Sequence, residues 1–325
     1  MKKKIYATNS AAKEAIDKLK QHFDVEVWDQ VKAPPKELII EKSKQFDGMM
    51  IESNCTFDEE VFQSAKTLKV VGTRAVGYDN IDLKAATANG IVVGNTPGIL
   101  VESCADFVFG LILSMARKIS YSNRKVINGD WKIFDQFPYL GTDVYGKTLG
   151  LIGLGAIAEA VAKRAQGFEM DILYNSRTRK PDVEEKYSLE WVPNIEDVFS
   201  RSDYVSIHVA LTKETENLIG YHEISKMKKD AFLINTSRGG TLNSKDLLRA
   251  LKENLIAGAA LDVTAPEPIA SDDPLVHMDN VLVTPHIASA SAETYVKMSL
   301  MAADNIISFF QGTDMPSCLN PEVLI

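Results

Sequence analysis

Short apolar runs alternate with longer amphipathic stretches along the first third of the chain. The runs are rich in Val and Ile and read KIYAT, VEVWD, GMMIES, LKVVGT and GIVVGN. The stretches between them, such as 11–22 and 38–45, carry apolar residues at helical spacing. This alternation predicts a parallel sheet with helices on both of its faces.

A second series of the same kind occupies the middle of the chain. Its apolar runs read TLGLIG, DILYNS, DYVSIHV, AFLINTS, AGAALDV and VLVTPH. Between the two series the pattern predicts one long helix over about 100–128, and after them a last helix over about 292–311. The first of these helices is apolar on most faces, so we expect it to be buried between elements or subunits.

The two series predict an α/β protein with two doubly wound parallel-sheet domains. The second series is flanked by the first series and by the last helix. We therefore expect one domain at 99–287, inserted into a discontinuous domain made of 1–98 and 288–325. A chain of 325 residues is long enough for two such cores.

The composition indicates which classes of binding partner and which cellular compartment to expect. The net charge of −8 disfavours a nucleic-acid or anionic-membrane partner. The three cysteines, Cys55, Cys104 and Cys318, are scattered, as buried thiols in a reducing compartment are. The most apolar run, 107–116, is too short to span a bilayer. We expect a cytoplasmic protein, and the sequence shows no cluster with metal-ligand spacing.

The second series opens with a glycine turn between a strand and a helix, which predicts a nucleotide-binding site. Its residues are Gly153, Leu154, Gly155, Ala156 and Ile157. The first glycine permits the tight turn, and the second lets backbone amides approach a pyrophosphate. Ala158 replaces a usual third glycine, where helix packing needs only a small residue. A glycine-rich turn without a ligand is the alternative interpretation.

The end of the next strand bears on which nucleotide binds. An NAD-binding domain usually carries an acid about 20 residues after the turn. Here Ser176 lies 21 residues after Gly155, and Arg177 and Thr178 follow it. An arginine and hydroxyls suit a ribose phosphate, so the sequence favours NADPH over NADH. A solvated basic turn, with NADH as the cofactor, is the alternative.

Three polar residues follow predicted strands of the second series. They are Arg238 in LINTSRGG, Glu267 in LDVTAPEP and His286 in LVTPHIASAS. Reduction of a 2-keto acid needs a cation for the carboxylate and carbonyl, a proton donor, and a carboxylate that orients the donor. Arg238, His286 and Glu267 meet these needs in turn. Singly, each also has a structural explanation: an ion pair, a solvated loop residue, or a capping histidine.

The residues now resemble a known family, the D-isomer-specific 2-hydroxyacid dehydrogenases. The resemblance runs from about residue 70 to 291 and rests on six motifs in the order of the family. They are GTRAVGYDNIDLKAATANGIVVGNTPG, YGKTLGLIGLGAIA, SIHVALTKETENLIG, INTSRGG, LDVTAPEP and TPHIASAS. The family implies a homodimer whose Rossmann cofactor domain is inserted in a flavodoxin-like substrate-binding domain.

The resemblance also implies roles for individual residues. Arg238 binds substrate, His286 is the acid/base and Glu267 is its partner. The backbone amides of Val76 and Gly77 hold the substrate carboxylate. The cofactor contacts implied are Leu154 to Ile157 at the pyrophosphate, Ser176 to Thr178 at the ribose phosphate, and Thr236, Ser237 and Asp262 at the nicotinamide. A buried Asp that caps a loop is an equal alternative for Asp262.

Within the family, GTDVYGKTLG and YNSRTRK are similar to the glyoxylate/hydroxypyruvate reductases and their 2-ketogluconate-reducing relatives. We therefore expect an NADPH-preferring reductase of a small 2-keto acid. Arg74 in GTRAVGY resembles instead the NADH-linked D-lactate and D-2-hydroxyisocaproate dehydrogenases, which are the alternative. A cofactor-gated binding module like the C-terminal-binding corepressors is a further alternative, disfavoured because only 312–325 follow the last predicted helix.

Overall fold

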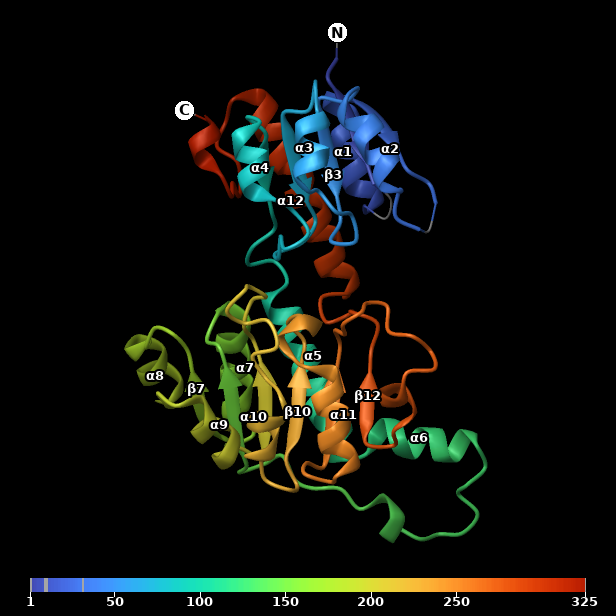
Figure 1. The fold of residues 1–325 in the computed structure, drawn as a ribbon, viewed down its shortest axis with the longest axis vertical. Helices are drawn as coiled ribbons and strands as arrows, with labels where there is room; N and C mark the ends of the chain where they lie inside the picture. The colour runs from blue at the N-terminus through green and yellow to red at the C-terminus, as the bar shows by residue number, and fades with distance from the viewer. Residues whose placement is uncertain (1, 9–10, 31, 325) are drawn as a thin grey trace. The chain divides into compact units, whose positions relative to one another are not determined.

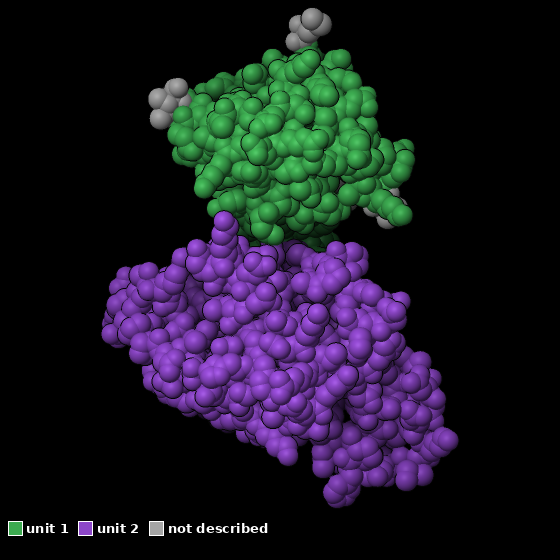
Figure 2. Space-filling view, in the orientation of Figure 1, with its two compact units in different colours: residues 1–100, 290–325 green, residues 101–289 purple. Residues whose placement is uncertain are grey.

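The computed structural model describes residues 2–8, 11–30 and 32–324. Its contacts divide the chain into two compact units, which Figure 2 colours separately. Unit 1 comprises Met1–Leu100 and Ala290–Ile325, and unit 2 comprises Val101–Ser289. The sequence placed the boundaries after residues 98 and 287, and each lies two residues later in the structure. The assignment of unit 1 to substrate and unit 2 to cofactor stays a prediction.

Among its described residues, unit 1 is built on a five-stranded parallel sheet in the order β2-β1-β3-β4-β5 (Figure 1). The strands are β1 (Lys4–Ala7), β2 (Asp24–Val27), β3 (Gly48–Ile51), β4 (Val70–Thr73) and β5 (Val92–Gly94). Every residue of β3 and β4 is buried. Strands covered on both faces are apolar throughout, which explains the unbroken runs in the sequence.

Among the described residues, five α-helices belong to this unit, and one of them, α12, packs closely against the sheet. They are α1 (Lys13–His22), α2 (Lys36–Ser43), α3 (Glu59–Ser64), α4 (Leu83–Ala88) and α12 (Ala292–Gln311), with a 3-10 turn η4 (Pro321–Leu324). A Cβ on Gly72 of β4 would lie 2.6 Å from the Ala302 carbonyl oxygen of α12. The last helix of the chain is therefore part of the core that the first hundred residues form, as the sequence predicted.

Unit 2 is built on a seven-stranded parallel sheet in the order β12-β11-β10-β9-β6-β7-β8. The strands are β6 (Thr148–Ile152), β7 (Asp171–Asn175), β8 (Leu189–Trp191), β9 (Tyr204–Ile207), β10 (Phe232–Asn235), β11 (Gly258–Leu261) and β12 (Val281–Val283). The chain moves outward from β6 through β7 and β8 and returns to β9 on the other side of β6. Open parallel sheets bind ligands beyond the carboxyl ends of the strands at such a reversal.

The helices of unit 2 lie on both faces of its sheet (Figure 1). They are α5 (Val101–Ala116), α6 (Ile119–Ile127), α7 (Ala156–Gln166), α8 (Pro181–Tyr187), α9 (Ile195–Arg201), α10 (Tyr221–Ser225) and α11 (Ser244–Lys252), with 3-10 turns η1 (Phe137–Tyr139), η2 (Gly239–Thr241) and η3 (Pro274–His277). The prediction of two doubly wound parallel sheets is confirmed.

The single helix predicted over about 100–128 is wrong, because the structure divides it into α5 and α6. Lys118 takes a left-handed backbone conformation, with a φ of 53°. The Ala116 carbonyl accepts a hydrogen bond from the Thr142 N–H at 2.8 Å, and a Cβ on the neighbouring Gly141 would lie 2.1 Å from that oxygen. The returning loop thus takes a carbonyl that a continuous helix would have used.

No helix within the described residues is long and apolar enough to cross a membrane.

Candidate active site

The glycine turn predicted from the sequence joins β6 to α7 in unit 2. Gly153 has a φ of +92°, and a Cβ there would lie 3.0 Å from the backbone of His208. A left-handed turn this close to a neighbouring strand end requires glycine. Nothing lies within 4 Å of a Cβ built on Gly155, so the space in front of the turn is open. Gly155 is also the residue that caps α7.

The rest of this turn anchors it and opens the helix. Leu154 and Ala158 are buried in the core, and Ala156 and Ile157 form the first turn of α7. The first N–H groups of a helix have no partner within it, and they point at whatever lies before the helix. The turn therefore offers backbone donors and open space to an anion such as a pyrophosphate.

The residues after β7 lie beside this turn. The Gly153 N–H donates to the Asn175 carbonyl at 2.8 Å, and the Ser176 hydroxyl donates to the Thr178 carbonyl at 2.6 Å. Arg177 is exposed and forms no ion pair with any residue that the structure describes. Arg179 differs from it, because its guanidinium holds Glu184 at 2.8 Å. Of these two arginines, Arg177 is the one that makes no ion pair among the described residues. The hydrogen bond from the Thr212 hydroxyl, and to a smaller degree the charge of Arg177, lower the pKa of Glu214.

A buried amide shapes the loop that carries Arg238. Asn235, the last residue of β10, is fully buried, and its Nδ2 donates to the Arg238 carbonyl at 3.0 Å. Its Oδ1 accepts from both the N–H and the hydroxyl of Ser237, at 3.0 and 2.9 Å. Thr236 and Ser237 are half-buried between these anchors. Asn235 was not predicted, because one amide at the end of an apolar strand has no distinctive sequence pattern.

The loops after β10 and β11 are in direct contact. A Cβ on Gly239 would lie 2.0 Å from the Thr264 carbonyl oxygen, so only glycine fits there. Because β10, β11 and β12 are neighbours in the sheet, the loops that carry Arg238, Glu267 and His286 leave the same edge. Three residues far apart in sequence thus follow three adjacent strands.

Glu267 and His286 form a hydrogen-bonded pair at this edge. The distance from His286 Nδ1 to Glu267 Oε1 is 2.5 Å, and the two side chains are 37% and 38% exposed. An ionised carboxylate only accepts hydrogen bonds, so Nδ1 carries the proton and Nε2 is left for a ligand. The pair is partly exposed, so a ligand can reach it.

Asp262 holds the segment that carries His286. Its carboxylate is 1% exposed and accepts from the Thr284 hydroxyl at 2.6 Å, the Ile287 N–H at 2.9 Å and the Ala288 N–H at 2.8 Å. The His286 N–H donates to the Asp262 carbonyl at 2.9 Å. Asp262 therefore caps this loop, the alternative given for it above, and its contact with a nicotinamide stays a prediction.

His208, at the end of β9, has different chemistry. Burial lowers the pKa of its imidazole to about 4, so the ring is neutral at pH 7. Its Nε2 lies 2.9 Å from the Ser206 hydroxyl, and no described carboxylate contacts it. It lacks the partner that makes His286 a candidate acid.

The predicted carboxylate-binding residues lie in unit 1, after β4. The Asn95 Nδ2 donates to the Val76 carbonyl at 2.9 Å, and the Thr96 N–H donates to the Ala75 carbonyl at 3.0 Å. These bonds tie the carbonyls of the loop to the segment after β5. Val76 and Gly77 are themselves half-buried.

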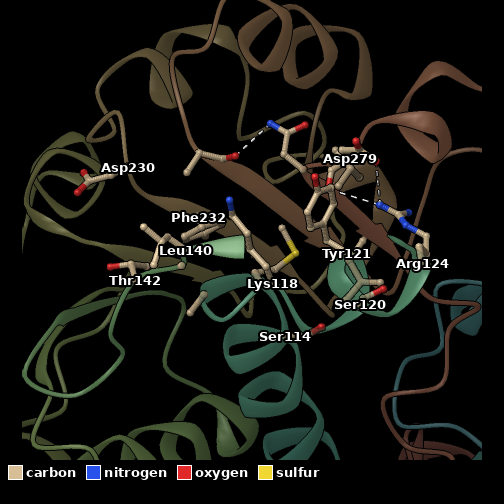
Figure 3. Close-up of a pocket in the computed structure, with 17 residues that line it drawn as sticks. Ser114, Lys118, Ser120, Tyr121, Arg124, Leu140, Thr142, Asp230, Phe232 and Asp279 are labelled. Atoms are coloured by element: carbon tan, nitrogen blue, oxygen red, sulfur yellow. Dashed lines mark hydrogen bonds and ion pairs between the residues drawn. The ribbon is translucent and has the colours of Figure 1, made fainter. Parts of the chain in front are cut away.

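A separate pocket of about 460 Å³ opens in unit 2, at the amino-terminal ends of the strands. Asp230, Phe232 and Asn280, at or before the starts of β10 and β12, line it together with the end of α5 and α6 (Figure 3). Arg124 of α6 holds Asp279 at 3.4 Å at its rim. The candidate catalytic residues follow the opposite ends of these strands, so this pocket is not their site.

No group of three or more His, Cys, Asp or Glu side chains within the described part of the chain could hold a metal ion.

Comparison with known proteins identifies the class. Residues 109–288 match the family model for the D-isomer specific 2-hydroxyacid dehydrogenase, NAD binding domain. The chain is 45% identical to a glyoxylate reductase of Korarchaeum cryptofilum over 100% of its length and 98% of that protein. It is 44% identical to a glyoxylate reductase of Pyrococcus horikoshii, with the same coverage.

Solved structures agree. A protein from Thermus thermophilus is 35% identical, with a TM-score of 0.92 over 97% of this chain and 99% of that one. An NADPH-dependent glyoxylate/hydroxypyruvate reductase from Sinorhizobium meliloti, solved with NADP and malonate, is 28% identical, with a TM-score of 0.87 over 98% of this chain and 97% of that one. The chain belongs to the D-isomer-specific 2-hydroxyacid dehydrogenase family. It is a nicotinamide-dependent oxidoreductase that interconverts 2-keto and 2-hydroxy acids.

Proposed function

We propose that this enzyme is an NADPH-preferring reductase of small 2-keto acids such as glyoxylate and hydroxypyruvate. In reverse it acts as a D-2-hydroxyacid dehydrogenase. The proposal rests on the His286–Glu267 hydrogen bond of 2.5 Å. This pair lies in the loops after β11 and β12, next to the loop after β10 that carries Arg238. The names of the relatives, which are glyoxylate reductases over the full length of this chain, support the substrate.

The three side chains have distinct roles in the reaction. The Arg238 guanidinium binds the substrate carboxylate and polarises the carbonyl, because it offers several fixed donors to oxygen. His286 protonates the carbonyl oxygen through Nε2 during reduction and accepts the proton during oxidation. Glu267 holds Nδ1 and so keeps the ring in the orientation and tautomer that this transfer needs. The backbone amides of Val76 and Gly77 bind the carboxylate.

The residues of the glycine turn suit a dinucleotide. The open space at Gly155 and the first amides of α7, which have no acceptor within the helix, suit a pyrophosphate. When bound, the cofactor supplies the hydride. Gly153, Leu154, Gly155, Ala156 and Ile157 would hold it there, with Thr236, Ser237 and Asp262 toward the nicotinamide.

The preference for NADPH rests on the segment after β7. Ser176, Arg177 and Thr178 stand where an NAD-specific enzyme usually carries an acid. Arg177 is exposed and makes no ion pair among the described residues, so its guanidinium can pair with a ribose phosphate.

The test is the initial rate of glyoxylate reduction with NADPH and with NADH at matched concentrations. We expect kcat/KM with NADPH to exceed kcat/KM with NADH by about tenfold or more, which corresponds to about 1.4 kcal/mol. Arg177→Ala should remove that advantage by raising the KM for NADPH. Arg179→Ala is the matched control, because that charge is paired with Glu184. Equal rates with both cofactors in the wild type would favour the NADH-linked D-lactate or D-2-hydroxyisocaproate type.

We also propose that the enzyme is a homodimer whose interface includes α6 and the loop that follows it. This segment exposes large apolar side chains: Ile119, Val126, Ile127, Trp131, Ile133, Phe134, Phe137, Leu140 and Tyr145. An apolar surface of this density is typical of a protein–protein contact. The pocket of about 460 Å³ lies beside α6 on the same unit, so this apolar surface borders a hollow.

A further inference from the structure

Glu52, Arg74 and Tyr295 form a charged and aromatic cluster in unit 1 that none of the roles above uses. Glu52 follows β3, Arg74 follows β4, and Tyr295 lies in the first turn of α12. The Arg74 Nη2 lies 2.9 Å from Glu52 Oε1 and its Nε lies 3.2 Å from the same oxygen. The guanidinium carbon lies 4.2 Å from the centre of the Tyr295 ring.

The cluster is held in place on several sides. The two charged side chains are only 15% and 14% exposed, so their attraction is less screened than that of a surface pair. The Arg74 N–H donates to the Ile51 carbonyl at 2.9 Å. Asn80 joins the two loops, because its Nδ2 donates to the Cys55 carbonyl at 2.7 Å. An arginine fixed by a carboxylate, a ring and its own backbone has little freedom to turn toward a ligand.

The cluster adjoins the proposed carboxylate-binding residues along the chain. One residue separates Arg74 from Val76, so their Cα atoms are at most about 7 Å apart. The substrates in question have three carbons or fewer. If the Val76 and Gly77 amides hold the carboxylate, the remaining carbons of the acid lie within reach of the cluster.

The charge balance of the cluster decides which substituent it tolerates. An unpaired arginine here would attract a second carboxylate on the substrate. Glu52 cancels that charge, so the pair is neutral overall and gives a second carboxylate no net attraction. Desolvating a carboxylate without a partner cation is unfavourable, and specificity often rests on such an unfavourable contact as much as on attractive ones. Glyoxylate and hydroxypyruvate carry a neutral hydrogen or hydroxymethyl group at this place.

We propose that the Glu52–Arg74–Tyr295 cluster is a specificity determinant that rejects 2-keto acids with a second carboxylate. The inference rests on the proposed function, since it assumes that Val76 and Gly77 bind the substrate carboxylate.

The experiment compares kcat/KM for oxaloacetate and hydroxypyruvate in the wild type and in Glu52→Gln. The substitution removes the negative charge and leaves Arg74 charged. We expect the ratio of oxaloacetate to hydroxypyruvate activity to rise at least tenfold, mainly through a lower KM for oxaloacetate. Adding Arg74→Gln to this variant should abolish the gain. Glu26→Gln, which removes the same charge from a pair with Lys42 elsewhere in unit 1, is the control.

An unchanged ratio in Glu52→Gln, with hydroxypyruvate still reduced, overturns the proposal. Should that variant not fold, Arg74→Gln alone gives the opposite test. Arg74→Gln leaves the Glu52 carboxylate without its partner, so the ratio of oxaloacetate to hydroxypyruvate activity should fall. An unchanged ratio again overturns the proposal.

A binding measurement separates this inference from the proposed function. If the wild type reduces no keto acid, the proposed function is wrong. The cluster is then tested by calorimetric binding of D-malate and D-glycerate to the enzyme with NADP⁺. At least tenfold tighter binding of D-malate to Glu52→Gln, with D-glycerate unchanged, supports the inference, and equal binding of D-malate to both proteins refutes it.

Discussion

His286 takes a left-handed backbone conformation, with a φ of 53°, that residues other than glycine seldom adopt. Hydrogen bonds from its N–H to the Asp262 and Thr284 carbonyls, at 2.9 and 3.0 Å, hold it there. Residues kept in rare conformations by their surroundings cluster at functional sites. Here the conformation accompanies the contact between the imidazole and Glu267.

His286→Asn tests the role of this side chain. Asparagine tolerates the left-handed conformation, so the loop should keep its shape. Loss of one acid catalyst lowers the rate by about 10²–10⁴-fold. We expect kcat for glyoxylate to fall in this range, with the melting temperature little changed. His277→Asn is the matched control, because His277 is an exposed histidine whose ring nitrogen bonds the Ser271 carbonyl and no acidic side chain within the described structure. An unchanged kcat and pH profile in His286→Asn would remove His286 from the mechanism.

Individual site residues were predictable to different degrees. Glu267 and His286 could be singled out because each is a polar residue in a loop after an apolar strand, and the structure brings them into contact. Asn235 could not, because its importance comes from four side-chain hydrogen bonds among the described residues of one short loop. The same holds for Asn95, whose amide supports the Val76 loop from the next strand.

At the scale of elements, apolar runs identified the strands of both sheets except β8, because most of these parallel strands are buried and therefore apolar. The edge strand β2 is mostly exposed, and its VEV run still identified it. The strand β8 was not predicted, since three residues, LEW, are too few for a pattern. The break between α5 and α6 was not predicted either. It depends on a hydrogen bond from Thr142, which lies 26 positions beyond Ala116 and whose approach no local pattern reveals.

The α6 helix has no buried residue, although one of its faces is apolar. Such a helix needs a partner to cover it, which is the basis of the proposed homodimer. We expect light scattering at micromolar concentration to give twice the 35.9 kDa of one chain. Ile127→Asp with Phe134→Asp, at side chains that are 74% and 86% exposed, should shift the mass toward one chain. Leu324→Asp, at an exposed residue of unit 1, should not.

A wild-type mass of 35.9 kDa under these conditions would refute the homodimer.

On the scale of the whole chain, the discontinuous layout followed from the order of the patterns. The second α/β series lies between the first series and the last helix. When connections are short and do not cross, this order leaves few possible topologies. The structure returns α12 to the first sheet, where the Asn305 Nδ2 donates to the Asn95 carbonyl at 2.8 Å. Which 2-keto acid is preferred does not follow from the order of elements, because substrate choice depends on single side chains, for which we propose Glu52 and Arg74.

We expect Arg238 to serve the substrate and not the cofactor. Glyoxylate turnover by Arg238→Ala, with NADPH affinity determined in parallel by fluorescence titration, tests this role. We expect turnover to fall by about 10²–10³-fold or more, because a fixed donor to the reacting carbonyl is lost. The dissociation constant for NADPH should stay within about twofold, a change of less than 1 kcal/mol. Near-normal turnover, or a loss of NADPH affinity as large as the loss of rate, would show that Arg238 does not act on the substrate.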